Sequence, residues 1–214
     1  MKIVPAILTD DPQELKRLIN LAEEYFDQVQ IDVLDGKFAD NETVDPLAFN
    51  HIETNMDLDF QLMVKEPVNW VEKCARAGAF RIVGHIEEMS DQFEFIEKVT
   101  KAGVKVGLGL DLDTEIYKLE RKLLPDLDAV LVMSVAAGFG GQTFNEFVLE
   151  KVKDLAKLKK SEDLNFNIVV DGGVTLEHME DLVAAGANEV AIGKRLFKGD
   201  LEENIARFAE VSGE

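Results

Sequence analysis

The sequence lacks cysteine pairs and long apolar runs. Only one of its 214 residues is a cysteine, Cys74, so no internal disulfide can form and a reducing compartment is allowed. No stretch of about eighteen uncharged apolar residues occurs, and the N-terminus, Met1–Pro5, is not a basic segment followed by an apolar one. We therefore expect a cytoplasmic protein in which Cys74 is a buried, inert thiol.

Basic residues are also few. The chain has 23 Lys and Arg against 42 Asp and Glu, for a formal net charge of -19. Nucleic acids and anionic membranes are bound through a positive surface, so we expect neither as a partner. An anionic substrate would need strong local attraction to overcome this negative field.

What the sequence does have is a regular alternation. With 46% hydrophobic and 30% charged residues, the composition is that of an ordinary globule that can bury a full core. Apolar, β-branched runs alternate with segments of helical spacing, which is typical of βα units around a parallel sheet. The expected strands are Ile3–Leu8, Gln28–Val33, Asp59–Val64, Phe80–His85, Val104–Leu110, Ala129–Val135, Asn167–Val170 and Glu189–Gly193. Helical spacing is seen, for example, at Leu15, Leu18, Ile19 and Ala22, and at Phe147, Val148, Val152, Leu155 and Leu158.

A glycine recurs where a helix should end and a strand should begin. Gly78, Gly103 and Gly186 hold this place, where glycine takes the left-handed conformation at little cost. Gly78 and Gly103 are 25 residues apart, and eight units in 214 residues give about 27 residues each. The sequence therefore predicts one α/β domain over residues 1–214, a closed TIM (β/α)8 barrel. An open doubly wound sheet is the alternative, but no Gly-x-Gly-x-x-Gly follows the first strand.

Candidate catalytic residues collect where strands end, because the carboxyl ends of barrel strands form the active-site face. Asp32 and Asp171 each follow a short apolar run, and we predict that they are catalytic. Other polar or sulfur-containing side chains on or at the ends of the strands are predicted to bind substrate: Gln30, Gln61, Met63, His85, Met133 and Ser134. His51 and His178 lie in charged, helical surroundings and are expected at the surface.

Glycine-rich loops follow the last three strands. Glycines let backbone N–H groups approach phosphate oxygens, the helix opened near Gly193 adds its positive end, and Lys194 adds a charge. The predicted phosphate-binding residues are Gly138, Gly140, Gly141, Gln142, Gly172, Gly173, Gly193 and Lys194. Phe139 lies in the first of these loops, which is expected to act as a lid.

Several segments, in order from the first strand to the last, resemble the ribulose-phosphate 3-epimerase family. They are 5–8 (PAIL), 30–36 (QIDVLDG), 61–63 (QLM), 132–144 (VMSV…GFGGQTF) and 170–174 (VDGGV). The segment 132–144 is the most specific of them. The resemblance implies a TIM barrel, a ketopentose phosphate such as ribulose 5-phosphate as substrate, proton transfer at C3, and a homo-oligomer, which is common in the family.

Inverting a carbon centre needs one base and a second acid on the opposite face, which two carboxylates can supply. In the family a divalent metal stabilises the enediolate intermediate. It is held by two aspartates that match Asp32 and Asp171, and by two histidines whose places here hold Gln30 and Gln61. An all-oxygen set suits magnesium, manganese or calcium rather than tight zinc. The cofactor is therefore left open, and the two aspartates are metal ligands only if a cation is bound.

The sequence departs from the family elsewhere too, at Ala6, Leu34 and Ala136–Ala137. Three functions are compatible with it. In the first, Asp32 and Asp171 epimerise a sugar phosphate while the two glutamine amides, or a weakly held hard cation, stabilise the enediolate. In the second, the barrel binds a sugar phosphate without turning it over. The third rests on Asp35–Asp40, whose Asp-x-Lys-x-x-Asp pattern resembles the orotidine-monophosphate decarboxylase suprafamily and contains Lys37.

The charges of the two aspartates generate one further expectation. Without a cation, Asp32 and Asp171 face each other in a dry barrel mouth, and their like charges raise the pKa of at least one. This expectation requires the two carboxylates to lie within about 10 Å of each other, roughly one Debye length.

Overall fold

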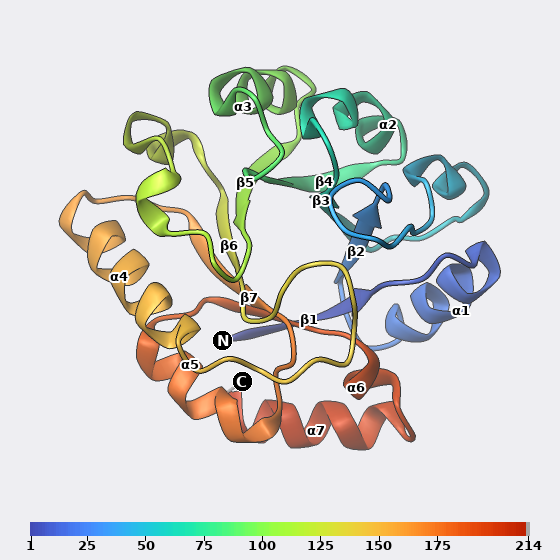
Figure 1. The fold of residues 1–214 in the computed structure, drawn as a ribbon. Coiled ribbons are helices and arrows are strands. Elements are labelled where there is room, and N and C mark those ends of the chain that lie inside the picture. The colour runs from blue at the N-terminus through green and yellow to red at the C-terminus, as the bar shows by residue number, and fades with distance from the viewer. Residues whose placement is uncertain (213–214) are drawn as a thin grey trace.

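The computed structural model describes residues 1–212 and is a closed barrel of eight parallel strands (Figure 1). The strands pair in chain order, and the last pairs with the first. They are β1 Lys2–Ile7, β2 Gln28–Leu34, β3 Asp57–Met63, β4 Ala79–His85, β5 Lys105–Leu110, β6 Ala129–Met133, β7 Asn167–Asp171 and β8 Glu189–Ile192. Each begins and ends within two residues of the bounds expected from the sequence. The TIM barrel is confirmed.

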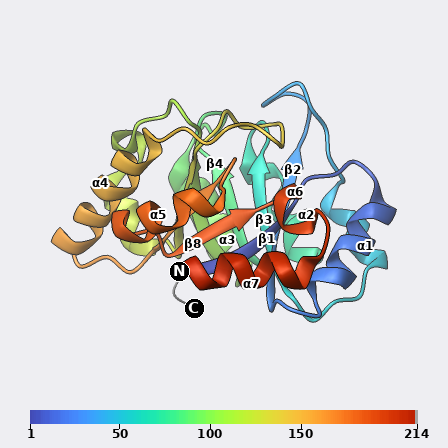
Figure 2. The ribbon, with the colours of Figure 1, turned by 90° about the horizontal axis from the view of Figure 1, so that it is seen from below.

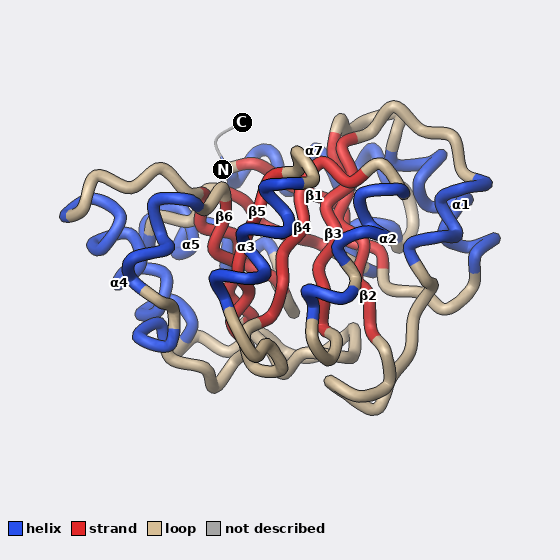
Figure 3. Tube along the Cα trace, turned by 90° about the horizontal axis from the view of Figure 1, so that it is seen from above, coloured by secondary structure: helices blue, strands red, loops and turns tan. Residues whose placement is uncertain are grey.

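Helices surround the strands on the outside (Figures 1 and 3). The α-helices are α1 Pro12–Ala22, α2 Val71–Arg76, α3 Gln92–Lys101, α4 Val148–Ser161, α5 Met179–Ala185, α6 Lys194–Phe197 and α7 Leu201–Ser212. Short 3-10 helices are η1 Pro46–His51, η2 Pro67–Asn69, η3 Ile116–Lys118, η4 Arg121–Asp126 and η5 Leu176–His178. Between β5 and β6 only 3-10 turns occur, and Pro125 inside η4 has no N–H to extend the segment into an α-helix.

The helical spacing read from the sequence is confirmed in α1, where Leu15, Ile19 and Ala22 are buried. Asp11 caps this helix, since its side chain accepts from the Gln13 N–H at 2.8 Å. In α4 the expectation was wrong at one position. Phe147 is 84% exposed because it precedes the helix as its N-cap instead of lying on the apolar face.

Two apolar clusters form the core. The larger fills the layer between the strands and the outer helices, and the smaller fills the inside of the barrel around Leu34, Met63, Leu131 and Met133. Cys74 is fully buried in the larger cluster, where burial raises the pKa of its thiol to about 12. The expectation of a buried, inert thiol is confirmed. Within residues 1–212, none of the helices is long and apolar enough to cross a membrane.

Glycine permits the turns that return the chain to the sheet. Gly78, Gly103 and Gly186 have φ values of 83°, 73° and 102°, in the left-handed region that was predicted for them. The loop that joins β6 to α4 lies across one end of the barrel, opposite the end where the N-terminus lies (Figure 2, yellow). This is the face where the carboxyl ends of the strands meet.

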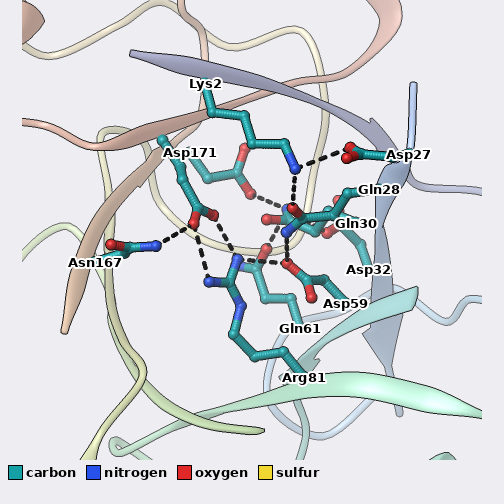
Figure 4. A network of polar contacts seen from close by, with 11 residues as sticks. Lys2, Asp27, Gln28, Gln30, Asp32, Asp59, Gln61, Arg81, Asn167 and Asp171 are labelled. Atoms are coloured by element: carbon teal, nitrogen blue, oxygen red, sulfur yellow. Dashed lines mark hydrogen bonds and ion pairs between the residues drawn. The ribbon is translucent and has the colours of Figure 1, made fainter. Parts of the chain in front are cut away.

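The other end of the barrel is filled by polar side chains instead of apolar ones (Figure 4). The buried guanidinium of Arg81 forms ion pairs with Asp59 and Glu189. Gln28 donates to Asp59 at 2.6 Å, and Asn167 donates to Glu189 at 2.6 Å. Burial raises the pKa of Asp59 to about 6 despite the opposing charge of Arg81. Arg81 is therefore the counter-charge that keeps two carboxylates inside the barrel.

Replacing Arg81 with Leu should lower the free energy of unfolding by about 3–5 kcal/mol, because two buried carboxylates lose their common counter-charge. Urea denaturation followed by circular dichroism measures this. Arg76→Leu is the control, since Arg76 is exposed on α2, and it should change stability by no more than about 0.5 kcal/mol. A loss of less than about 1 kcal/mol for Arg81→Leu would show that the network does not support the barrel.

Candidate active site

A cavity of about 380 Å³ opens at the carboxyl ends of the strands. Asp32, Asp171, Met63 and Met133 line its floor. All eight residues predicted to bind phosphate line its walls: Gly138, Gly140, Gly141, Gln142, Gly172, Gly173, Gly193 and Lys194. Segments more than 150 residues apart in the sequence therefore build one site.

The two aspartates converge from different parts of the barrel. Asp32 lies on β2 and Asp171 ends β7, and β1 and β8 separate these strands. One nitrogen, Gln30 Nε2, donates to Asp32 Oδ1 and to Asp171 Oδ2, each at 2.9 Å (Figure 4). These two oxygens are therefore separated by at most twice that distance. The expected proximity is confirmed.

The Gln61 amide completes the cluster around the carboxylates. Gln61 Oε1 accepts from Gln30 Nε2 at 2.6 Å, and Gln61 Nε2 lies 3.0 Å from His85 Nε2 and 3.1 Å from Met133 Sδ. Both glutamines are buried, at 3% and 0% exposure, so neither side chain has water as an alternative partner. Gln30 and Gln61 therefore lie beneath the cavity as a layer that supports the two aspartates.

The Gln30 amide opposes a half-turn of the Gln61 amide group that would exchange its oxygen and nitrogen. The turned amide nitrogen would lie 3.0 Å from Asp32 Oδ1 and 2.8 Å from Asp171 Oδ2, but also 2.6 Å from the nitrogen of Gln30. Two N–H donors cannot share that contact, so Gln61 can turn only if Gln30 turns with it. In either arrangement one amide NH2 group donates to both carboxylates and one amide oxygen faces them.

Burial and like charge alter the ionisation of the pair. Burial, followed by the charge of Asp171, raises the pKa of Asp32 well above its usual value. Burial also raises the pKa of Asp171 to about 6, although the hydrogen bond from Gln30 opposes the shift. The pair therefore retains a proton at a pH where exposed aspartates have lost theirs. A protonated carboxyl can donate to the Gln61 oxygen that faces it.

His85 lies at the end of this network and is fully buried. Its Nδ1 is 3.3 Å from Glu87 Oε2, within ion-pair distance but without hydrogen-bond geometry. Burial would raise the pKa of Glu87, but the contact with His85, together with the Thr114 side chain and the Asp111 backbone N–H, which donates to Glu87 at 2.7 Å, lowers it to about 2. Glu87 was not among the site residues predicted from the sequence, although its position two residues after His85, just past the end of a strand, could have indicated it.

Ser134 has a structural position. Its hydroxyl donates to the carbonyl oxygens of Asp171, at 3.0 Å, and Gly172, and its side chain is fully buried outside the cavity lining. Ser134 therefore holds the backbone that carries Asp171. His85 likewise does not line the cavity. The substrate-binding roles predicted for these two residues stay predictions.

On the cavity wall predicted to bind phosphate, the backbone of the loop after β7 lies close to that of the loop after β6. Gly173 has a φ of 59°, and a Cβ atom there would lie 2.6 Å from the Phe144 nitrogen and 2.8 Å from the Gln142 oxygen. The loop after β6 is also held by Asn41, whose side chain donates to the Gly138 oxygen at 2.6 Å. Only glycine at position 173 lets these two loops meet.

Positive charge lines the same side. Lys194 is exposed, and within residues 1–212 no carboxylate lies within ion-pair distance of it. Two further cations, Arg17 and Arg195, line the cavity and were missed in the sequence. Arg17 is paired with Glu14 at 2.7 Å, and Arg195 donates to the Gly173 oxygen at 2.9 Å. Within the described residues, Lys194 and Arg195 are therefore the cations of this wall that have no carboxylate within ion-pair distance, and both can attract an anion.

The divalent metal that the sequence resemblance implies would have to be held by the two aspartates and the two glutamines. Within the described part of the chain, no group of three or more His, Cys, Asp or Glu side chains is arranged to hold a metal ion. The cluster offers two carboxylate oxygens and one amide oxygen, and the remaining position holds the Gln30 NH2 group, which has no lone pair to donate. Zinc and iron favour imidazole or thiolate ligands, so these residues do not fit them.

The two remaining histidines and Lys37 lie outside the cavity lining. His51 is exposed, as expected. The expectation was wrong for His178, which is half-buried, stacks on Phe144 at 4.1 Å and closes a capping box with Thr175. Lys37 is exposed.

Comparisons with known proteins agree with this geometry. The chain matches the ribulose-phosphate 3 epimerase family over residues 2–197. It is 36% identical over 203 residues to the ribulose-phosphate 3-epimerase of Bacillus subtilis, covering 92% of each chain. It is 34% identical over 200 residues to the chloroplastic ribulose-5-phosphate-3-epimerase of Arabidopsis thaliana, covering 91% of this chain and 71% of that one.

Solved structures confirm the architecture alone. A tryptophan synthase alpha-subunit variant from Pyrococcus furiosus superposes with a TM-score of 0.69 at 15% identity, covering 100% of this chain and 98% of that one. Phosphoribosyl anthranilate isomerase from Thermus thermophilus superposes with a TM-score of 0.63 at 14% identity, covering 100% and 99%. Because the family match and the named relatives each extend over most of its length, the chain belongs to the ribulose-phosphate 3-epimerase family.

Proposed function

We propose that this protein interconverts the C3 epimers of a ketopentose phosphate of the ribulose 5-phosphate and xylulose 5-phosphate type. The observation that carries the proposal is the pair of buried carboxylates on the floor of the cavity. Asp32 and Asp171 both accept a hydrogen bond from the same amide nitrogen, Gln30 Nε2. The glycine loops and Lys194 on the wall of that cavity support a phosphorylated substrate.

The chemistry follows from the protonation of the pair. The ionised carboxylate removes the C3 proton, which is acidic because C3 is adjacent to the C2 carbonyl, and the electron pair moves into an enediolate over C2 and C3. The protonated carboxyl then delivers a proton to C3 from the opposite face. The carbon is inverted with no net oxidation, and the two carboxyl groups have exchanged protonation states.

The pKa shifts of Asp32 and Asp171 are consistent with one of them acting as an acid and the other as a base. A buried pair in which one member is raised well above its usual pKa and the other to about 6 supplies one acid and one base near neutral pH. Neither carboxyl is held by a cationic side chain within hydrogen-bond distance in the described structure. The pair can therefore exchange its proton without breaking an ion pair.

The phosphate is assigned to the loops after β6, β7 and β8. Glycine lets the backbone approach phosphate oxygens closely, and Lys194 supplies a mobile positive charge. Arg195 lies beside it but already donates to the Gly173 oxygen, and it contributes by fixing the loop. This local positive charge opposes the net charge of -19 on the chain.

A barrel that binds a sugar phosphate without turning it over is the second candidate, favoured by the glutamines that stand where the family has metal-binding histidines. The decarboxylase-like alternative has less support, because Lys37 is exposed and does not line the cavity. A cytoplasmic location, the absence of a nucleic-acid partner and a homo-oligomeric state stay predictions.

Asp32→Asn and Asp171→Asn should each lower the rate of epimerisation by about 10²–10⁴-fold, because each removes one of the two proton-transfer groups. Nuclear magnetic resonance of the sugar phosphate in heavy water separates the steps. Each variant should still exchange the C3 proton of one epimer, and the two variants should differ in which epimer exchanges.

Asp10→Asn is the control, since Asp10 is exposed and should leave both steps unchanged. Absence of deuterium at C3 with the unmodified protein at high concentration, with or without added metal, would leave only the binding function.

The pH dependence of kcat/KM tests the carboxylate assignment. Asp171 with a pKa of about 6 is ionised above that pH and protonated below it. Below about pH 6 the pair has no base, so kcat/KM should fall about tenfold for each pH unit. Steady-state kinetics between pH 4.5 and 8 measure this, and a flat profile down to about pH 5 would contradict it.

Gly173→Ala should weaken binding of the sugar phosphate and of inorganic phosphate at least about tenfold, since the added Cβ would displace the loop at Phe144 and Gln142. Isothermal titration calorimetry measures both affinities. Gly78→Ala has a similar positive φ of 83° but nothing within 4 Å of its Cβ, so it should cost about 1 kcal/mol of stability without changing affinity. Equal affinities for the two variants would argue against phosphate binding at this wall.

A further inference from the structure

Three oxygen atoms converge on a single nitrogen at the centre of the site. Gln30 Nε2 lies 2.9 Å from Asp32 Oδ1, 2.9 Å from Asp171 Oδ2 and 2.6 Å from Gln61 Oε1. An amide NH2 group has two hydrogens, so it spans these three acceptors with shared bonds. Such convergence of carboxylate and amide oxygens on one point is the arrangement expected around a cation.

The amide therefore already supplies the positive end that the carboxylates require. Its hydrogens carry partial positive charge, and in this buried site they face two groups whose like charges repel. Removing this donor would leave Asp32 and Asp171 with no shared hydrogen-bond partner. Gln61 cannot replace it without also turning, because the two amide ends are 2.6 Å apart.

A bound hard cation would require a different arrangement. Gln30 would have to present its oxygen in place of its NH2 group, which would put that oxygen 2.6 Å from Gln61 Oε1 and 2.9 Å from both carboxylates. Four oxygens with no donor between them repel one another unless a cation lies among them. The amide orientation and the presence of a cation are thus alternatives.

We propose that in this chain the Gln30 NH2 group takes the place of the family's metal ion, and that it holds Asp32 and Asp171 together without a bound divalent cation. The role of this amide in catalysis rests on the proposed function, whereas the prediction that the unmodified protein binds no divalent cation does not. The amide differs from a metal in carrying no full charge, so the carboxyl pair must keep a proton to remain together, as the hydrogen-bond geometry at Gln61 allows.

Gln30→Glu converts the donor into an acceptor of the same shape. The variant brings three carboxyl groups and the Gln61 oxygen to one point, a ligand set that suits magnesium, manganese or calcium. It should be less stable than the unmodified protein in the presence of a chelator. Magnesium or manganese at about a hundred times its dissociation constant should then raise its Tm by about 5–10 °C.

Gln28→Glu is the matched control. Gln28 lies on the same strand and the same face, two residues earlier, and is equally buried. Its amide also donates to a carboxylate, Asp59, at 2.6 Å, but Lys2 and Arg81 already supply cations there. Any loss of stability in Gln28→Glu should therefore not be restored by a divalent cation.

The experiment measures metal content by mass spectrometry after chelator dialysis, and Tm and calorimetric binding with magnesium, manganese, calcium and zinc. The unmodified protein should hold less than about 0.1 equivalent of metal and shift in Tm by less than about 1 °C with each ion. Binding of one equivalent of any of these ions by the unmodified protein, with a Tm rise of several degrees, would overturn the proposal.

A second variant tests the same proposal if the Gln30→Glu protein does not fold. Gln30→His combined with Gln61→His restores two imidazoles beside the two aspartates and should bind zinc or manganese, while the unmodified protein should not. If neither variant gains metal binding while the unmodified protein binds metal, the proposal is wrong. If the unmodified protein lacks both metal binding and deuterium exchange, the proposed function fails and the assignment of the amide stands.

Discussion

The site depends on the burial of two like-charged carboxylates against one hydrogen-bond donor. Asp32 and Asp171 are 7% and 8% exposed, and their common partner is the amide nitrogen of Gln30. Bringing two ionised carboxyl groups this close in a site of low dielectric is unfavourable. The pKa values of both are therefore raised, and the one donor that they share partly offsets their repulsion. Burial and like charge, which make the ionised pair unfavourable, also keep one carboxyl protonated as an acid while the other is ionised as a base.

The barrel supplies the rigidity that this arrangement needs. Parallel strands place the side chains of alternate residues inside, so Gln28, Gln30 and Asp32 form successive levels of one strand. The end of β2 that carries Gln28 meets the Arg81 network, Gln30 bonds to Gln61 further along, and Asp32 lies under the cavity. The interior of this barrel is therefore polar along one side, where the Gln30 amide joins Asp32 of its own strand to Asp171 across the barrel and the Arg81 guanidinium joins Asp59 to Glu189.

Most of the architecture could be predicted from the chain. Alternating apolar runs fixed the eight strands to within two residues, because strands covered on both faces must be apolar. The glycines after helices and the glycine loops were recognisable because only glycine tolerates those conformations and approaches. Phe147 and His178 were misplaced, since helical spacing does not show where a helix begins or which aromatic ring, here Phe144, will lie beside a given side chain.

By itself the sequence determined the barrel, the two carboxylates at strand ends and the glycine loops that follow them, because each of these depends on local residue type and spacing. Only the tertiary structure decided that the Gln30 nitrogen reaches both carboxylates, and that Ser134 supports the backbone of Asp171 instead of lining the cavity. Those contacts join β2 to β7 and β6 to β7. Distances across a closed barrel are set by strand register and closure, which no local pattern in the sequence records.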